Sequence, residues 1–272
     1  ALGDWKAPDN WYQRSIEERN KWDEYVAKES GPTNQELPSY AHAVGAVYRN
    51  SDPSDIVVTA AGGLVGEVVQ IWKPKELNTF ETEWGFSCMS YEISGALGIK
   101  MAKPDQDVIV FVGDGSYLLQ NSDIYSSVLY DKKLIIVVCD NGGHMVINRL
   151  QLAKGGNEYL CNLNAARATN VQFVDFEAHA KSMGANGETV KSISELEAAF
   201  KRAKESDKTY VISMKTDGYE WLEGTAFWES PTLEVDNTEG KKSALNEFLE
   251  GKNKQRKGCL LYTSDAADDL IG

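Results

Sequence analysis

The sequence of 272 residues has few of the residues that build metal clusters and disulfide frameworks. Its cysteines show no CxxC or cysteine–histidine spacing, which argues against a thiolate metal site and against a disulfide framework. The three histidines are too few and too scattered to indicate zinc. We therefore expect oxygen ligands for any metal, and buried, reduced thiols at Cys88, Cys139, Cys161 and Cys259.

Positive charge and long apolar runs are also scarce. Lysine and arginine total 28 against 41 acidic residues, a formal net charge of −13. This balance repels phosphate backbones and anionic lipid surfaces, so neither nucleic acid nor a membrane is an expected partner. No apolar run approaches the roughly 20 residues that span a bilayer. The first residue is not methionine and no signal-peptide pattern follows, so we expect a cytoplasmic chain that begins within a longer protein.

What is present is the pattern of an α/β protein. Hydrophobic residues make up 42% of the chain, and β-branched runs alternate with helical stretches, which predicts a doubly wound parallel sheet with helices on both faces. The runs are continuously apolar, as expected of strands buried on both sides. The predicted strands are 55–60, 107–112, 133–139 and 209–214, and the predicted helices are 38–49, 87–102, 122–130, 176–183 and 194–204. Ser194 with Glu197 predicts a capping box at the start of the last helix.

The remaining segments suggest how the chain is organised. Residues 1–35 are expected to be a connector from an upstream domain, 36–235 the main domain and 236–257 a helical extension. The segment 144–172 has little strand pattern and is expected to be a loop that faces substrate. The last residues, 258–272, resemble translated sequencing-adapter DNA and are expected to be non-native.

Glycine-rich turns follow three of the predicted strands, at Gly62-Gly63, Gly113-Asp114-Gly115 and Asn141-Gly142-Gly143. Ligands of doubly wound sheets bind beyond the carboxyl ends of the strands, and such turns let the backbone approach a phosphate. Only one helix and one strand separate Asp114 from Asn141, so their turns should be neighbours. A carboxylate and an amide oxygen suit Mg²⁺, and together they predict a Mg²⁺-diphosphate site.

These residues carry a family resemblance. Gly113-Asp114-Gly115, 24 residues and then Asp140-Asn141 is similar to the signature of thiamine diphosphate enzymes. The stretch from Glu83 to Ala102 and the stretch from Val110 to Tyr117 resemble the trihydroxycyclohexane-1,2-dione hydrolases of inositol catabolism. The resemblance covers about residues 10–235. It implies the diphosphate-binding domain of an enzyme that uses thiamine diphosphate and Mg²⁺ to open a cyclic polyhydroxy dione by C–C hydrolysis, giving a deoxy-glucuronic acid.

The resemblance also implies roles for individual residues. Asp114, Asn141 and the Gly143 carbonyl would bind Mg²⁺, and Met89 would bend the cofactor while the Ser87 carbonyl accepts from its aminopyrimidine. The remaining cofactor contacts would come from the glycine turns and the residues beside them: Gly62, Gly63, Leu64, Gly113, Gly115 and Ser116. The glutamate that activates the cofactor would come from the pyrimidine domain of a second subunit in a homo-oligomer, because this chain has no such domain.

One departure concerns the hydrolytic acid or base. The family pattern places histidine directly after the asparagine, whereas here His144 comes two places later. His144 is the candidate for proton transfer, and a solvent-bonded loop histidine is the alternative. Asn148, Arg149 and Gln151 are candidates for polyol recognition, and a solvated polar loop is their alternative.

Two other functions stay open. One is a different enzyme of the same superfamily, such as an acetolactate-synthase-like carboligase or a 2-oxoacid decarboxylase. The other is a cofactor-binding module without catalysis of its own.

Overall fold

The computed structural model describes residues 4, 6–83, 85–166, 172–224 and 238–255. These residues form two compact units. The larger unit contains the described residues of 1–146 and 160–222, and the smaller unit contains those of 147–159 and 223–272. The predicted tail 258–272 lies outside the described residues, and the predicted boundaries at 35, 235 and 257 stay predictions.

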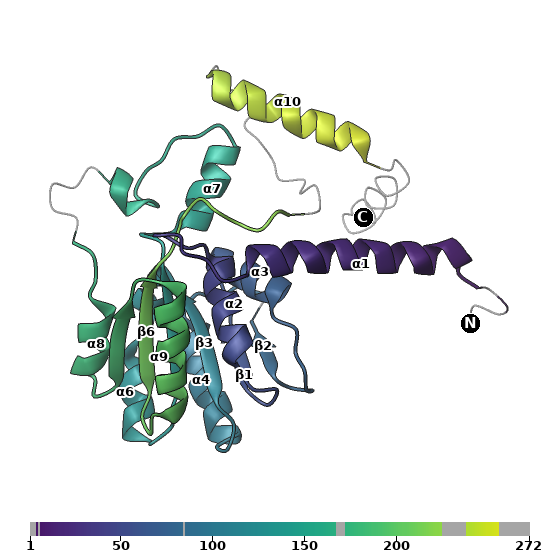
Figure 1. Ribbon diagram of the computed structural model, residues 1–272. Coiled ribbons are helices and arrows are strands. Elements are labelled where there is room, and N and C mark those ends of the chain that lie inside the picture. Colours follow the sequence, from purple (N-terminus) through teal and green to yellow (C-terminus); the bar gives the residue numbers. More distant parts are fainter. Residues whose placement is uncertain (1–3, 5, 84, 167–171, 225–237, 256–272) are drawn as a thin grey trace, which may run out of the picture. The chain divides into compact units, whose positions relative to one another are not determined.

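The larger unit is built on six parallel strands in the order β2-β1-β3-β4-β6-β5 (Figure 1). The four central strands are buried along nearly all of their length, as their continuous apolar runs predicted. The strands are β1 (Ile56–Thr59), β2 (Phe80–Thr82), β3 (Val108–Gly113), β4 (Ile135–Asp140), β5 (Asn186–Val190) and β6 (Tyr210–Lys215).

Helices cover both faces of this sheet, which confirms the predicted doubly wound architecture (Figure 1). Alternate residues of one strand face opposite cores: Ile109 and Phe111 pack into one, Val108 and Val110 into the other. The first core includes residues of α1 (Asp9–Glu29), α2 (Tyr40–Asn50), α3 (Gly62–Ile71) and α9 (Ile193–Glu205). The second includes residues of α4 (Tyr91–Ala102), α5 (Asp114–Leu119), α6 (Ser122–Leu129) and α8 (Phe176–Ser182).

Two edge strands were not predicted. β2 has only three residues, and none of them is fully buried. β5 reads Asn-Gly-Glu-Thr-Val, in which only Gly187 and Val190 are buried, so it contains no continuous apolar run. Edge strands are half-covered, so their sequences lack the pattern that identified the central strands.

Three local predictions were wrong. The helix expected over 87–102 begins at Tyr91, because Ser87 and Ser90 adopt positive φ angles of 50° and 79°. The helix expected over 194–204 is capped two residues earlier than expected, and the cap is not a capping box, because Glu195 accepts from Lys191 rather than from the N-cap residue Ser192. Ser192, not Ser194, accepts from the Glu195 N–H at 3.2 Å, and Glu195 accepts from the Lys191 N–H at 2.8 Å.

The third concerns the expected loop 144–172, which contains a helix, α7 (Met145–Ala153), and a 3₁₀ turn at Leu163–Ala165. Most of α7 belongs to the smaller unit, which also contains α10 (Glu239–Lys254). There Gly155, at a φ of +71°, packs directly on the backbone of Gly240. No helix in the described part of the chain is both long enough and apolar enough to cross a membrane.

The expectation of buried thiols holds for only one described cysteine. Cys139 is buried in β4, Cys161 is partly buried and Cys88 is exposed, and all three are free. Cys88 is exposed because it lies in the segment that turns before α4 rather than inside that helix. Cys259 lies outside the described residues.

Candidate functional site

The candidate site consists of three turns that follow the carboxyl ends of β1, β3 and β4. We call residues 60–63, 113–116 and 140–143 the site turns. β1, β3 and β4 are adjacent and parallel, so their carboxyl ends point the same way. Gly113 pairs with Cys139 at the last step of the β3–β4 ladder. The turns that carry Asp114 and Asn141 are therefore neighbours, as the sequence predicted.

Asp114 is a buried carboxylate in a site turn, with 5% of its surface exposed. Burial and the charge of Asp140 raise its pKa to about 7, although the backbone N–H groups of Gly143, Asp114 and Gly115 oppose the rise by donating to it. A carboxylate held this way gains much from a cation beside it, because the cation favours the charged form. Asp140 is paired with Lys215 at 2.5 Å.

Asn141 presents a buried amide oxygen. Its Oδ1 atom has no hydrogen-bond partner in the structure, and an unpaired buried acceptor is costly. A Mg²⁺ ion beside Asp114 would satisfy it. The described residues contain no group of three or more His, Cys, Asp and Glu side chains able to hold a metal, so a metal here needs amide and carbonyl ligands such as Asn141 and Gly143. The donor set fits Mg²⁺.

The turn after β1 offers open space at one glycine only. Gly62 has a φ of +79°, and a Cβ atom placed there would meet nothing within 4 Å. Gly63 is covered, since its Cβ would lie 2.1 Å from the Trp221 ring. Leu64 is buried in the core, so it can contribute only its backbone to a ligand. Of the three predicted contacts, Gly62 has the most accessible backbone.

Ser116 is buried and its hydroxyl is already engaged. It donates to the Glu92 carboxylate, with distances of 3.0 and 2.9 Å to the two oxygens, and it accepts from the Ser90 N–H at 2.7 Å. A ligand contact by Ser116 would therefore use its backbone. Glu92 was not predicted as a site residue.

The segment before α4 folds around the Glu83 carboxylate. Glu83 accepts from the N–H groups of Phe86 at 2.8 Å and Cys88 at 2.6 Å, and these bonds hold its pKa below the usual range. Glu83 thus has a local structural role in the segment before α4. Ser87 is exposed and Met89 is half-buried, and nothing in the structure tests their predicted cofactor contacts.

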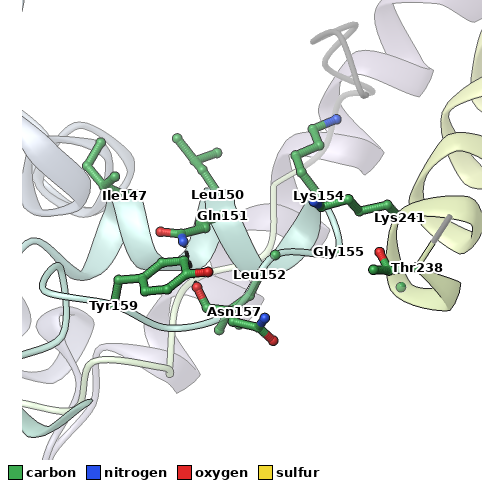
Figure 2. Close-up of a pocket in the computed structure, with 12 residues that line it drawn as sticks. Ile147, Leu150, Gln151, Leu152, Lys154, Gly155, Asn157, Tyr159, Thr238 and Lys241 are labelled. Atoms are coloured by element: carbon green, nitrogen blue, oxygen red, sulfur yellow. Dashed lines mark hydrogen bonds between the residues drawn. The ribbon is translucent and has the colours of Figure 1, made fainter. Parts of the chain in front are cut away.

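His144 is exposed and directly follows the site turn 140–143. Its ring lies against Gly115 in the site turn 113–116. The polar residues expected to face substrate, Asn148, Arg149 and Gln151, belong to the smaller unit. In the smaller unit, Asn148 is buried and donates to Glu158 at 2.8 Å, and its Oδ1 atom has no partner. Gln151 lines a cavity of about 1000 Å³ and donates to the Asn157 carbonyl at 2.6 Å, as Figure 2 shows. Lys154 and Lys241 also line this cavity (Figure 2).

Comparisons with known proteins agree with the fold. The family described as "Thiamine pyrophosphate enzyme, C-terminal TPP binding domain" matches residues 60–214. Two solved structures share the fold: a thiamine diphosphate-dependent 4-hydroxybenzoylformate decarboxylase of Rhodococcus jostii RHA1 and a benzoylformate decarboxylase of Polynucleobacter necessarius. Their TM-scores are 0.57 and 0.59 at 19% and 21% identity, over 68% and 71% of this chain and 34% and 35% of theirs.

Curated relatives are more similar in sequence. A protein of Halalkalibacterium halodurans named 3D-(3,5/4)-trihydroxycyclohexane-1,2-dione hydrolase is 36% identical over 71% of this chain and 30% of its own length. A protein of the same name from Listeria monocytogenes is 34% identical over 90% of this chain and 38% of its length. The chain thus spans about a third of these relatives. Its match over residues 60–214 shows that the chain belongs to the family of thiamine pyrophosphate enzymes and carries their C-terminal TPP binding domain.

Proposed function

We propose that the chain is the diphosphate-binding part of a thiamine diphosphate- and Mg²⁺-dependent hydrolase that opens the ring of trihydroxycyclohexane-1,2-dione. The observation that carries the metal assignment is the buried, unpartnered Oδ1 atom of Asn141 in the turn next to Asp114. The substrate class rests on the names of the curated relatives.

The residues of the chain divide the binding task. Asp114, Asn141 and the Gly143 carbonyl would hold Mg²⁺, and the backbone at Gly62, Gly115 and Ser116 would contact the diphosphate. When bound, thiamine diphosphate supplies a thiazolium carbon that adds to a carbonyl and accepts the electron pair of the breaking C–C bond. The chain's task is to orient that group and to balance its charge.

A proton donor or acceptor is also required, because hydrolysis moves protons to and from the reacting oxygen and carbon. His144 is our candidate, since its imidazole lies against Gly115 in a site turn and is exposed to a ligand there. Replacement of His144 by Gln should then lower kcat for ring opening more than it lowers cofactor affinity. Equal loss of both would assign His144 to binding instead.

We further propose that a second subunit completes the site. α5 begins at Asp114 and exposes Leu118 and Leu119 by 49% and 61%, and Phe86 near the site is 91% exposed. Apolar side chains gathered beside a binding site favour coverage by another protein surface. A pyrimidine domain of the partner, supplying the activating glutamate, is the proposed cover.

The test is product analysis with the cyclic dione and with pyruvate, using a protein that carries this chain together with the sequence that its relatives have in addition. Ring opening of the dione supports the proposal, whereas turnover of pyruvate alone supports a carboligase or decarboxylase. Cofactor binding without H/D exchange at the thiazolium C2 would support a non-catalytic module. The 272-residue chain by itself should bind Mg²⁺-thiamine diphosphate weakly and show no ring opening.

A further inference from the structure

Glu92 is a buried carboxylate directly behind the site turns. It lies in the first turn of α4 and is only 1% exposed. Its Oε1 atom accepts from the Ala61 N–H at 3.3 Å, and both carboxylate oxygens lie within 3.0 Å of the Ser116 hydroxyl, which donates to them. The carboxylate therefore contacts two of the three site turns.

These contacts join segments that are far apart in the chain. Ala61 is 31 residues from Glu92 and belongs to the turn after β1, whereas Ser116 is 24 residues away in the turn after β3. Through Ser116, the network also includes the N–H of Ser90 at the start of α4. One side chain thus sets the spacing between the turn that contains Gly62 and the turn that contains Gly115.

The charge of Glu92 makes this arrangement unusual. Burial raises its pKa, and the hydrogen bonds from Ser116 and the backbone oppose that rise. No ion pair with Glu92 is found among the described residues. A buried carboxylate without a cation is destabilising in itself, and here it lies near turns expected to bind an anion. The hydrogen bonds that the Glu92 carboxylate accepts from two site turns offset this cost.

We propose that Glu92 is the positioning residue of the diphosphate site: it holds the turns 60–63 and 113–116 at the separation at which both contact one diphosphate group. The inference rests on the proposed binding of thiamine diphosphate. It adds a residue that does not touch the ligand and acts through Ala61 and Ser116.

Calorimetric titration of the 272-residue chain with pyrophosphate in the presence of Mg²⁺, and then with thiamine diphosphate, tests the proposal. Glu92→Ala should weaken pyrophosphate binding about tenfold or more. Glu92→Gln keeps one acceptor oxygen and turns the other into an amide N–H donor that the Ser116 hydroxyl oxygen can accept, so its affinity should stay within about threefold of the wild type. Rescue by glutamine distinguishes positioning of the turns from a requirement for the negative charge.

Glu67→Ala is the matched control. Glu67 is a second glutamate of the same unit, 3% exposed, and accepts from the Leu222 N–H at 3.1 Å. We expect its replacement to lower the melting temperature while leaving pyrophosphate affinity within about twofold. This control separates a loss of stability from a loss of positioning.

Three results would decide against the inference or its basis. If folded Glu92→Ala binds pyrophosphate as tightly as the wild type, or if Glu92→Gln is as weak as Glu92→Ala, the positioning role is wrong while the proposed function stands. If the wild-type chain binds neither ligand even at concentrations high enough to detect the weak binding proposed above, the proposed function fails first, and this inference with it. Should Glu92→Ala not fold, Ser116→Ala replaces it, with an expected loss of about three- to tenfold and unchanged affinity as the contrary result.

Discussion

The imidazole ring of His144 occupies the space that a side chain on Gly115 would need. A Cβ atom at position 115 would lie 2.6 Å from Cε1 and 2.7 Å from Nδ1 of His144. Gly143 is crowded in a different way, because its Cβ would lie 2.4 Å from the Cys161 carbonyl oxygen and its φ is +140°. A side chain at position 115 would therefore meet an exposed ring, whereas a side chain at position 143 would meet backbone atoms.

This difference predicts unequal costs for two similar substitutions. Gly115→Ala should change the free energy of unfolding by less than about 1 kcal/mol, since the exposed ring can rotate away and alanine favours the helix. Gly143→Ala should cost roughly 2–3 kcal/mol or more, because neither the backbone carbonyl nor the φ angle can adapt. Urea denaturation of both variants measures the costs. A Gly115→Ala cost as large as that of Gly143→Ala would contradict the packing described here.

Asp114 predicts a pH dependence of stability in the metal-free protein. The pKa of Asp114 in the folded state is about 7, against 3.8 for a free aspartate carboxyl, so the folded state binds the proton more tightly than the unfolded state. Stability from this group is fully present below about pH 4 and is lost as the pH rises through about 7, a change on the order of 2–4 kcal/mol.

Urea denaturation at pH 5, 6, 7 and 8 without metal tests this dependence. Asp114→Asn, which cannot ionise, should remove most of the decline between pH 5 and 8. In the wild type, Mg²⁺ should reverse the decline in the free energy of unfolding, because the ion favours the charged carboxylate. In a separate binding measurement, Asp114→Ala should abolish Mg²⁺-dependent cofactor binding. If wild type and Asp114→Asn respond identically to pH, the burial of a titrating Asp114 is not what shapes the stability profile.

The sequence predicts the centre of this fold better than its edges. The four central strands are buried on both faces, so each is a continuous apolar run such as Ile135–Asp140, whose first five residues are apolar. β5, in contrast, pairs with a neighbouring strand on one side only and has the largely polar sequence of Asn186–Val190. Its place beside β6 depends on pairing with a strand about 20 residues away, which a local pattern does not contain.

The same distinction applies to the site. Asp114 and Asn141 each follow a predicted strand directly, and the parallel order of β3 and β4 makes their turns neighbours. Glu92 follows no strand, and in the sequence it is the one carboxylate of a helix that also contains Ser94 and Lys100. Its position behind two site turns arises only when folding brings Ala61 and Ser116 to it.

Ser90 and Gly62 both have positive φ angles, and substitutions at the two positions should change the stability of the fold in opposite directions. Ser90 has a φ of 79° just before α4, and its backbone N–H donates to Ser116. Ser90→Gly keeps that donor and relieves the left-handed conformation, so it should stabilise the fold by about 0.5–1 kcal/mol. Gly62→Ala, at the same φ but in open space, should destabilise it by about 1 kcal/mol. Thermal unfolding of both variants gives the two signs, and a destabilised Ser90→Gly would refute the assignment of strain.

At the amino ends of the strands, Lys204 is the centre of a network of charges in which Asp55 is buried. Its ammonium group lies 2.6 Å from Asp55, 2.9 Å from Asp52 and 3.1 Å from Asp107. Asp55 is only 3% exposed; burial raises its pKa, and Lys204 opposes that rise. Removal of the ammonium would leave the Asp55 carboxylate without its charged partner in a buried position.

Lys204→Met should therefore lower the free energy of unfolding by about 3 kcal/mol at pH 7, the cost of leaving a buried charge unpaired. The cost should shrink towards pH 5, because the pKa of Asp55 rises further without Lys204 and a protonated carboxyl needs no cation. Lys181→Met is the control, since its pair with Glu177 is exposed and worth less than about 0.5 kcal/mol. Urea denaturation of both variants at pH 5 and 7 measures these costs. If Lys204→Met and Lys181→Met lower the free energy of unfolding equally at pH 7, the buried Asp55 carboxylate does not depend on Lys204.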